Sequence, residues 1–364
     1  MLIKDQIIDG VINFACQLYK TLDHNNNLFF SPHSISTAMS LAYAGAQGET
    51  ADQIAKVFGY PQTNQDTITE SLMSLATSNE DKIKLVAANS LWVQAGYSLL
   101  EEYHRKMGSL ISEVDFGNTV MATARINKWV ENNTNNLIKD LIPPDLLNNL
   151  VKLILVNAIY FKGSWTKAFN PEETRLRDFH CLDGRVVKAD MMFAKEMEIK
   201  TICDRNRMAT RLYYGNNSVY MTIILPNNFS SYVTAFDGCE FKQVQQQLDN
   251  TQEDEIDLYL PKFKLESTLS LQEKLMELGV KNACIPGLAD FSGITGNRGL
   301  FVSNVLHKAV IDVSEEGTEA AAATAMLMRF CCDSGSRFIA DKPFIFVICE
   351  ENGTPLFMGH VVSF

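Results

Sequence analysis

Residues 315–325 read EEGTEAAAATA, and residues 326–336 continue as MLMRFCCDSGS. This stretch follows the apolar run Val305–Val313, which is predicted to be a strand, and a second strand pattern begins near Phe338. Roughly 20 residues therefore connect two strands without an obvious packing partner, and connections of this length in compact domains are usually functional.

Composition leaves two interpretations of this stretch open. Alanine is the best helix former, so the first is an Ala-rich surface helix. Against it, the segment has no apolar face with which a helix could dock, and it begins with Gly317, which is costly inside a helix. As a strand it has two different faces, one formed by Thr318, Ala320, Ala322, Thr324 and Met326 and the other by Glu319, Ala321, Ala323 and Ala325. The first face is small and uncharged, as is needed in a segment that is exposed in one state and buried in a sheet in another.

The rest of the chain predicts an α+β fold. Helical spacing is found in the first third, where Ser34 can cap one helix and Thr50 with Gln53 forms a capping-box pattern for the next; the expected helices are Ile7–Tyr19, Ser34–Tyr43, Thr50–Phe58, Met121–Asn133 and, later, Leu269–Leu278. In Leu153–Phe161 both the odd and the even positions are mainly apolar, which predicts a central strand buried on both faces. Asp183-Gly184 and Asn352-Gly353 indicate hairpins. Since there is no repeat, linker or break in composition, we expect one domain over residues 1–364, with helices packed on mainly antiparallel sheets.

Charge and hydropathy exclude several classes of partner. The 364 residues carry a net charge of -11, and no run of five basic residues occurs, which argues against a nucleic-acid partner and against binding to anionic membranes. The most apolar run, Leu150–Phe161, is too short to span a bilayer. Lys4, Asp5 and Asp9 interrupt any apolar leader, so we expect no signal peptide.

The eight cysteines show irregular spacing and no C-x-x-C pair, so we expect no metal, no cofactor and a reducing compartment. The cytoplasm is the expected location, with leaderless release to the extracellular space or surface left open. No motif of a hydrolase, metalloprotease or nucleotide-binding enzyme is found. A cysteine hydrolase that uses Cys331 and a distant histidine is the remaining enzyme hypothesis, but a cysteine in an Ala-rich loop lacks a held base. We therefore expect no catalytic residue.

Blocks along nearly the whole chain resemble the serpin family. The first is the stretch 315–324 itself, which resembles the hinge of an inhibitory serpin almost residue for residue. The others, in the family's order and spacing, are NLFFSP (27–32), SIS (34–36), YAGA (43–46), GET (48–50), LVNAIYFKGSW (155–165), LPKF (260–263), ADFSG (289–293), VLHKA (305–309), DKPFIF (341–346) and PLFMGHV (355–361).

Within that family the chain resembles the ovalbumin-like, largely intracellular branch, and its loop resembles that of leukocyte elastase inhibitor. His360 is a departure, because the family more often has Lys or Arg there. The resemblance implies three mainly antiparallel sheets, about eight or nine α-helices and an exposed reactive-centre loop at residues 315–337.

The resemblance also implies a function. A target serine protease attacks the loop as a substrate and forms an acyl-enzyme. The cleaved loop then enters the main sheet as a new strand, and the protease is held in a covalent complex with a monomeric inhibitor. Loop insertion of this kind is a documented form of strand addition. A proline or an inward charge would slow insertion, and neither occurs between Ala320 and Ala325, so an active inhibitor is expected.

Residue roles follow by motif match. The hinge is Glu315, Glu316, Gly317, Thr318, Glu319, Ala320, Ala321, Ala322, Ala323 and Thr324. At the breach, where insertion begins, Glu315 should pair with Lys262 and Trp165 should pack close by. The shutter, a hydrogen-bonded cluster that lets the central strands part, should be Ser31, Ser34, Asn157 and His307.

The scissile bond has three candidates. The usual family spacing from Gly317 places it between Cys331 and Cys332, which suits elastase-type pockets. A shift of one residue gives Phe330, for chymotrypsin-like proteases, and a shift of two gives Arg329, for trypsin-like ones. The adjacent thiols of Cys331 and Cys332 would also permit redox control. A non-inhibitory serpin, such as a carrier or chaperone, is the alternative function.

Overall fold

The computed structural model describes residues 2–75, 82–143, 145–316 and 336–364. Its helices are α1 (Ile3–Thr21), α2 (Pro32–Tyr43), α3 (Gly48–Phe58), α4 (Gln65–Leu75), α5 (Glu101–Met107), α6 (Thr119–Asn133), α7 (Phe229–Ala235), α8 (Gly238–Asp249), α9 (Gln272–Leu278) and α10 (Ser292–Thr295). These ten in the described ranges compare with the eight or nine expected, and α10 is a single turn of four residues. None of the helices in these ranges is long and apolar enough to cross a membrane.

Within the part of the chain that the structure describes, the strands form two hydrogen-bonded sheets. They are β1 (Leu28–Phe30), β2 (Ile83–Gln94), β3 (Ile111–Val114), β4 (Leu153–Gly163), β5 (Arg175–His180), β6 (Val186–Cys203), β7 (Arg207–Tyr214), β8 (Val219–Pro226), β9 (Glu253–Pro261), β10 (Phe263–Ser270), β11 (Val302–Val313), β12 (Ser336–Ile339), β13 (Phe344–Glu350) and β14 (Pro355–Val361). The first sheet has the order β10-β11-β4-β2-β3, and the second runs β1-β14-β13-β8-β7-β6-β9-β12 with β5 beside β6.

Two of the three expected sheets are joined into this second sheet by the long strand β6. Its first part pairs with β5 and its last residues pair with β7, while β9 follows it along most of its length. The pairing with β9 is irregular between Ala194 and Met197, where the strand bends. One continuous hydrogen-bonded sheet therefore contains strands that the family resemblance assigned to two separate sheets.

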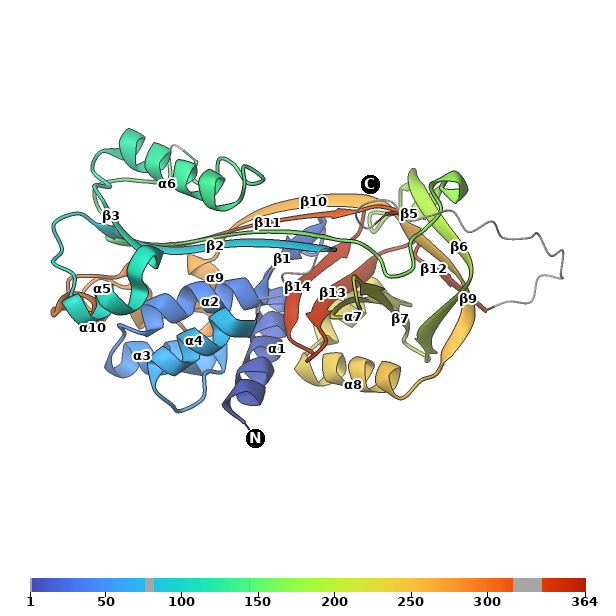
Figure 1. Cartoon of the computed structure of the whole chain (residues 1–364), viewed down its shortest axis with the longest axis horizontal. Coiled ribbons are helices and arrows are strands. Elements are labelled where there is room, and N and C mark those ends of the chain that lie inside the picture. The colour runs from blue at the N-terminus through green and yellow to red at the C-terminus, as the bar shows by residue number, and fades with distance from the viewer. Residues whose placement is uncertain (1, 76–81, 144, 317–335) are drawn as a thin grey trace.

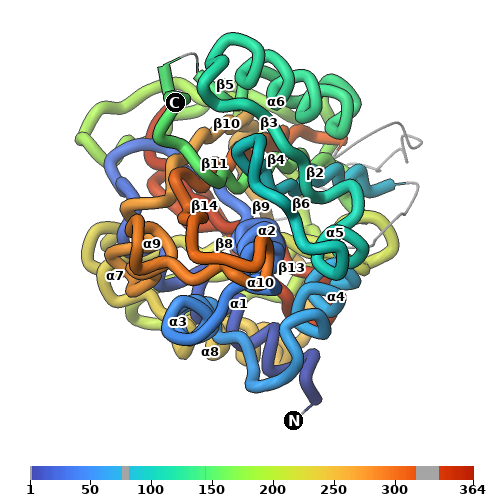
Figure 2. The backbone as a smooth tube through the Cα atoms, turned by 90° about the vertical axis from the view of Figure 1, so that its left-hand side faces the viewer, coloured from blue at the N-terminus to red at the C-terminus, as the bar shows by residue number. Residues whose placement is uncertain are grey.

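The five-stranded sheet lies between two helical layers. Figure 1 shows α6 on its upper face, and α1 to α4 with α9 below it. The view turned by 90° in Figure 2 keeps α6 above the sheet and places α2 directly beneath it. Beneath the sheet, α2 lies against β2 and β4.

Both faces of β4, the central strand of this sheet, are almost entirely buried, as its apolar run predicts. Leu153 and Leu155 belong to the core shared with the lower helices, whereas Ile154 and Val156 belong to the core beneath α6. Further along the strand, Phe161 packs in the core between the two sheets. A strand without a polar face is therefore the correct interpretation of this sequence.

Local signals set several helix boundaries, though not all those expected. Ser31, not Ser34, caps α2: the Ser31 side chain accepts a hydrogen bond from the Ser34 N–H, and Pro32 is the first helical residue. The capping box predicted at Thr50 is wrong, because α3 begins at Gly48 and the buried Thr50 hydroxyl instead accepts from the Asp290 N–H at 3.0 Å. The expected helix Leu269–Leu278 starts later, since Leu269 and Ser270 complete β10.

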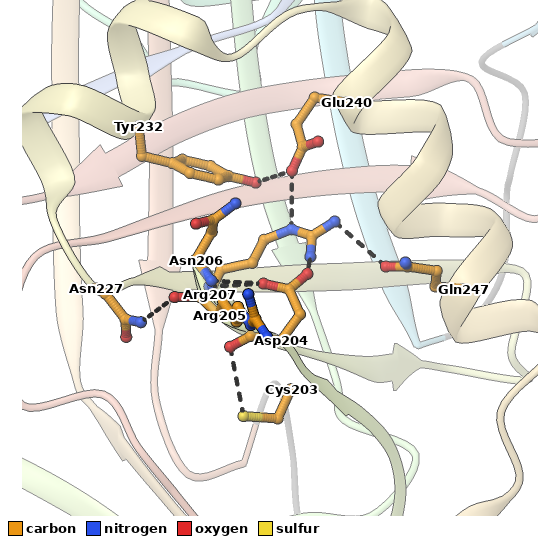
Figure 3. A network of polar contacts seen from close by, with 9 residues as sticks. All are labelled: Cys203, Asp204, Arg205, Asn206, Arg207, Asn227, Tyr232, Glu240 and Gln247. Carbon is orange, nitrogen blue, oxygen red and sulfur yellow. Dashed lines mark hydrogen bonds and ion pairs between the residues drawn. The ribbon is translucent and has the colours of Figure 1, made fainter.

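A buried arginine fixes α7 and α8 against the second sheet. The Arg207 side chain is 2% exposed and forms ion pairs with Asp204 and, at 2.9 Å from Nε, with Glu240 of α8. Tyr232 of α7 donates to the same Glu240 carboxylate at 2.6 Å. Figure 3 shows Arg207 between these groups, with Gln247 of α8 at the far side of the guanidinium.

Candidate functional site

The candidate site is the pair of central strands β4 and β11, with the chain that leaves β11. These strands are parallel, and their register joins Leu155 to Val305 and Phe161 to Ile311. On their outer sides β4 is antiparallel to β2, and β11 is antiparallel to β10. Because β11 is an inner strand, the described residues that follow it leave the sheet near its centre. These residues are Ser314, Glu315 and Glu316.

Two hydrogen bonds hold the backbone at this departure point. The indole Nε1–H of Trp165 donates to the Ser314 carbonyl at 2.9 Å, and the Phe169 N–H donates to the Glu315 carbonyl at 3.0 Å. Trp165 is itself buried, and its ring stacks on Tyr214 with centroids 4.1 Å apart. The segment that follows β4 therefore binds the segment that follows β11.

The Glu315 side chain is also held. Lys262 Nζ lies 2.9 Å from Oε2, and the Thr174 hydroxyl donates to Oε1 at 2.7 Å. Burial alone would raise the pKa of Glu315, but the hydrogen bonds from Lys262 and Thr174 outweigh it, and the pKa lies below its ordinary value. The expected pair of Glu315 with Lys262 is thus present, with Trp165 on the neighbouring carbonyl. Thr174 was missed, since a threonine in a polar stretch carries no distinguishing signal.

A polar cluster lies in the otherwise apolar middle of the sheet. His307 of β11 faces Asn157 of β4, and its Nδ1 bonds to Oδ1 of that amide. The Asn157 amide donates to the Ser34 carbonyl at 3.2 Å, and also contacts the hydroxyl of Ser34. Ser31 completes the group, because its N–H donates to His307 Nε2 at 3.0 Å and its hydroxyl donates to the Leu356 carbonyl at 2.6 Å. The four residues expected in the shutter therefore meet.

Asn89 of β2 belongs to the same cluster and was not predicted. It lies opposite Asn157 in the β2–β4 ladder, and its Oδ1 accepts from Asn157 and, at 3.2 Å, from the Ser34 hydroxyl. The available signal was an asparagine in the middle of a mostly apolar strand. The residue that Asn89 faces depends on the register of the strands, and this register cannot be derived from the sequence.

The hydrogen bonds define the protonation state of His307. Because the Ser31 N–H donates to Nε2, that nitrogen is unprotonated and Nδ1 carries the proton toward Asn157. The imidazole is completely buried, and this desolvation lowers its pKa from 6.5 to about 3. A neutral histidine therefore bridges helix α2 and both central strands.

The remaining predicted site residues lie outside the described residues. These are the hinge from Gly317 through Thr324 and the scissile-bond candidates Arg329, Phe330, Cys331 and Cys332. Glu316 is described, and it is an exposed turn residue. In the described part of the chain, no group of three or more His, Cys, Asp or Glu side chains could hold a metal ion.

Comparison with known proteins yields one family. A family model described as "Serpin (serine protease inhibitor)" matches residues 9–364. The chain is 36% identical to a serpin-like protein of Thermococcus kodakarensis, over 98% of this chain and 85% of that protein. It is 33% identical to leukocyte elastase inhibitor of Xenopus laevis, over 99% of this chain and 100% of that protein. Uncleaved ovalbumin superposes with a TM-score of 0.86 at 25% identity, over 98% of this chain and 100% of that structure. These matches confirm the resemblance predicted from the sequence blocks.

Proposed function

Because this chain belongs to the serpin family, we propose that it inhibits serine proteases as a suicide substrate and is not itself an enzyme. In this proposal residues 1–364 act as one domain and as a monomer. Residues 315–337 are the bait, which a protease cleaves and which then inserts into the five-stranded sheet.

The parallel pairing of β4 with β11 is the observation that carries the proposal. A chain that leaves the end of β11 and folds back would run antiparallel to β11, and also antiparallel to β4. Insertion between them would replace one parallel ladder by two antiparallel ladders, which are slightly more stable per residue. The sheet would then be antiparallel throughout its centre.

The energetics are sufficient to distort an attached protease. A strand of about a dozen residues adds a net ladder of about a dozen hydrogen bonds, each contributing about 1 kcal/mol. Burial of its small side chains adds to this. The total is comparable to the stability of a whole domain, about 5–15 kcal/mol.

The two polar clusters control this insertion in our proposal. The contacts of Lys262, Thr174 and Trp165 keep the chain after β11 at the mouth of the strand pair. The cluster of Asn157 and His307 keeps the middle closed until strain from the cut chain is applied. Gly317 is the pivot, and Thr318 is the first residue to enter.

The chemistry belongs mainly to the protease. Its serine oxygen forms an ester with the carbonyl carbon of the residue before the cut, and the peptide nitrogen of the next residue leaves with a proton from the protease histidine. We propose Cys331–Cys332 as the bond, with Phe330 and Arg329 as alternates. Displacement of the protease then removes the oxyanion hole from the ester, so water does not complete deacylation.

Covalent trapping tests the proposal. The protein is mixed with elastase, chymotrypsin and trypsin, and a band that survives boiling in detergent is expected at the summed mass of one inhibitor and one protease. Mass spectrometry of the released C-terminal peptide identifies the cut bond. If all three proteases only cleave the loop, the proposal is wrong and a non-inhibitory serpin remains.

A matched pair of variants tests the strand faces. Ala322→Arg places a charge on the face predicted to turn inward, and Ala323→Arg places it on the opposite face. We expect Ala322→Arg to be cleaved as a substrate and Ala323→Arg to keep trapping the protease. Equal behaviour of the two variants would contradict insertion with this parity.

We also propose that the protein acts in a reducing compartment, the cytoplasm. The described cysteines are all unpaired thiols, and burial raises the pKa of Cys16, Cys284 and Cys349 to about 12 each. Alkylation of the denatured protein, isolated under acid quench, should modify all eight cysteines. Protected disulfides would argue for an oxidising compartment.

A further inference from the structure

A cavity of about 600 Å³ opens beside Trp165, between the segment after β4 and the strands β6, β7 and β8. Its volume lies within the range of small-molecule sites, about 300–1,000 Å³. The inner wall is apolar and largely buried, and we call it the floor: Trp165, Phe169, Met197, Ile199 and Leu212. Such a surface suits an aromatic or aliphatic group.

Acidic side chains dominate the outer edge of this cavity. Four carboxylates line it, from Glu198, Asp249, Glu253 and Glu351, against the two cations Lys167 and Arg211. We call Glu198, Glu253 and Glu351 the acidic rim.

Both cations are already paired. Lys167 Nζ lies 3.4 Å from Glu198 and 3.9 Å from Glu253, so one cation serves two carboxylates. Arg211 lies 2.6 Å from Asp249. Within the described residues, no ion pair involves Glu351. The cavity therefore carries an excess of two negative charges.

We infer that the cavity binds an organic cation, with its ammonium group at the acidic rim and its aromatic or aliphatic body on the floor. The protein already places one cation in this way, because Arg211 Cζ lies 4.2 Å from the centre of the Tyr220 ring on the cavity wall. Among the described residues that line the cavity, an anion would meet uncompensated carboxylates and no unpaired cation, so charge complementarity excludes it.

Occupation of the cavity would also act on the chain after β11, a second step that rests on the proposed function. Two floor residues hold that chain: the Trp165 indole binds the Ser314 carbonyl, and the Phe169 N–H binds the Glu315 carbonyl. A ligand packed on both would stabilise the closed arrangement, in which β4 and β11 are paired. It should therefore slow insertion of the cleaved loop.

Binding is tested on the full chain by titration calorimetry with three matched probes. These are 2-(2-naphthyl)ethylamine, its neutral N-acetyl derivative and the anion 3-(2-naphthyl)propionate. We expect saturable binding of the amine, at least about fivefold weaker binding of the neutral probe and none of the anion. Absence of saturable binding by the amine, or equal binding of all three, overturns the inference.

Charge variants locate the site. Glu351→Gln and Glu253→Gln should each weaken binding of the amine by about threefold to tenfold, as expected for one partly screened charge at the surface. Glu255→Gln is the matched control, because Glu255 is an exposed acid in β9, the strand of Glu253, and does not line the cavity. Met197→Trp should fill the cavity and abolish binding, with thermal unfolding as the check that it folds. If the rim variants and the control lose affinity equally, the site is elsewhere.

The coupling is measured separately. The ratio of covalent complex to cleaved inhibitor should fall as the amine saturates the wild type, and the midpoint of this fall should move to about threefold to tenfold higher amine concentration in Glu351→Gln. If no complex forms even without the amine, the proposed function fails while the calorimetric result stands. If the amine binds and the ratio stays constant, the coupling is wrong.

Discussion

The Glu315 carboxylate keeps its charge although its side chain is only 8% exposed, because Lys262 and Thr174 both bind it. Thr174→Val removes one of these hydrogen bonds and preserves the shape of the side chain. A hydrogen bond to a charged group contributes about 1.5–3 kcal/mol, so the free energy of unfolding should fall by about 2 kcal/mol in chemical denaturation.

The matched control for this prediction is Thr234→Val. The Thr234 hydroxyl donates to the Ser230 carbonyl at 2.9 Å on an exposed helix, so its loss should change stability by less than about 0.5 kcal/mol. Equal losses in the two variants would mean that Thr174 stabilises the protein only through general packing.

His307 predicts sensitivity to acid. Its pKa is about 3 in the folded protein against 6.5 as the ordinary value, so below pH 6.5 the unfolded chain binds a proton that the folded chain does not. Stability is therefore complete above pH 6.5 and falls toward pH 3, by about 1.4 kcal/mol per pH unit for this imidazole. Burial also lowers the pKa of His33 and His360 to about 4, and these add to the slope.

The test is the pH dependence of the free energy of unfolding between pH 7 and pH 4. His307→Gln should reduce the slope of the free energy of unfolding against pH by about 1.4 kcal/mol per pH unit, the contribution of one proton. This holds whatever the effect of the substitution on stability at pH 7. An unaltered slope in His307→Gln would show that the imidazole is not the titrating group.

At the scale of elements, the ion pairs of Arg207 attach α8 to the second sheet. Arg207→Met leaves Glu240 near the sheet without its cation, and breaking a buried pair in this way costs about 3–5 kcal/mol. Replacing both partners, as Arg207→Met with Glu240→Leu, should recover part of that loss, since Glu240 no longer lacks its cation, while Asp204 and Tyr232 still lose a partner. Thermal and chemical unfolding of the single and double variants measure this.

An exposed pair between helices provides the control. Lys242 Nζ lies 2.7 Å from Asp9, with both side chains about 40% exposed, so Lys242→Met should cost less than about 1 kcal/mol. A double variant no more stable than Arg207→Met alone would contradict the argument from burial.

Helices and strands were predictable from sequence where the spacing of apolar residues alone determines them. In Leu153–Phe161 both alternating sets of positions are apolar, which identified a strand buried on both faces. Asn352-Gly353 identified the hairpin of β13 and β14. Boundaries that depend on tertiary contacts were not predictable. Thr50 reads as a helix cap but serves Asp290, which is distant in sequence. Asn89 enters the polar cluster only through the register of β2 on β4.

At the scale of the whole molecule, the contacts expected from the family blocks are present at one end and in the middle of the central strand pair. Lys262, Trp165 and Glu315 meet at one end, and Asn157 meets His307 in the middle. The acidic cavity beside Trp165 was not predicted, because its walls come from segments that are far apart along the chain. A motif records residues that are neighbours in sequence, whereas a cavity is produced by how separate elements pack.

The proposed insertion makes its strongest prediction at this scale. If cleavage in residues 317–335 adds a strand between β4 and β11, the cleaved protein gains on the order of 10 kcal/mol. With an unfolding entropy of about 2.1 cal/mol/K per residue over 364 residues, each 1 kcal/mol shifts the midpoint of unfolding by about 1.3 °C, so a rise of about 13 °C is expected. Calorimetry before and after nicking with a protease of another catalytic class measures it. The cleaved Ala322→Arg variant should lack most of this rise, because its inward charge would have to be buried in the sheet. If nicked wild type melts where intact protein does, the paired strands do not open for the loop.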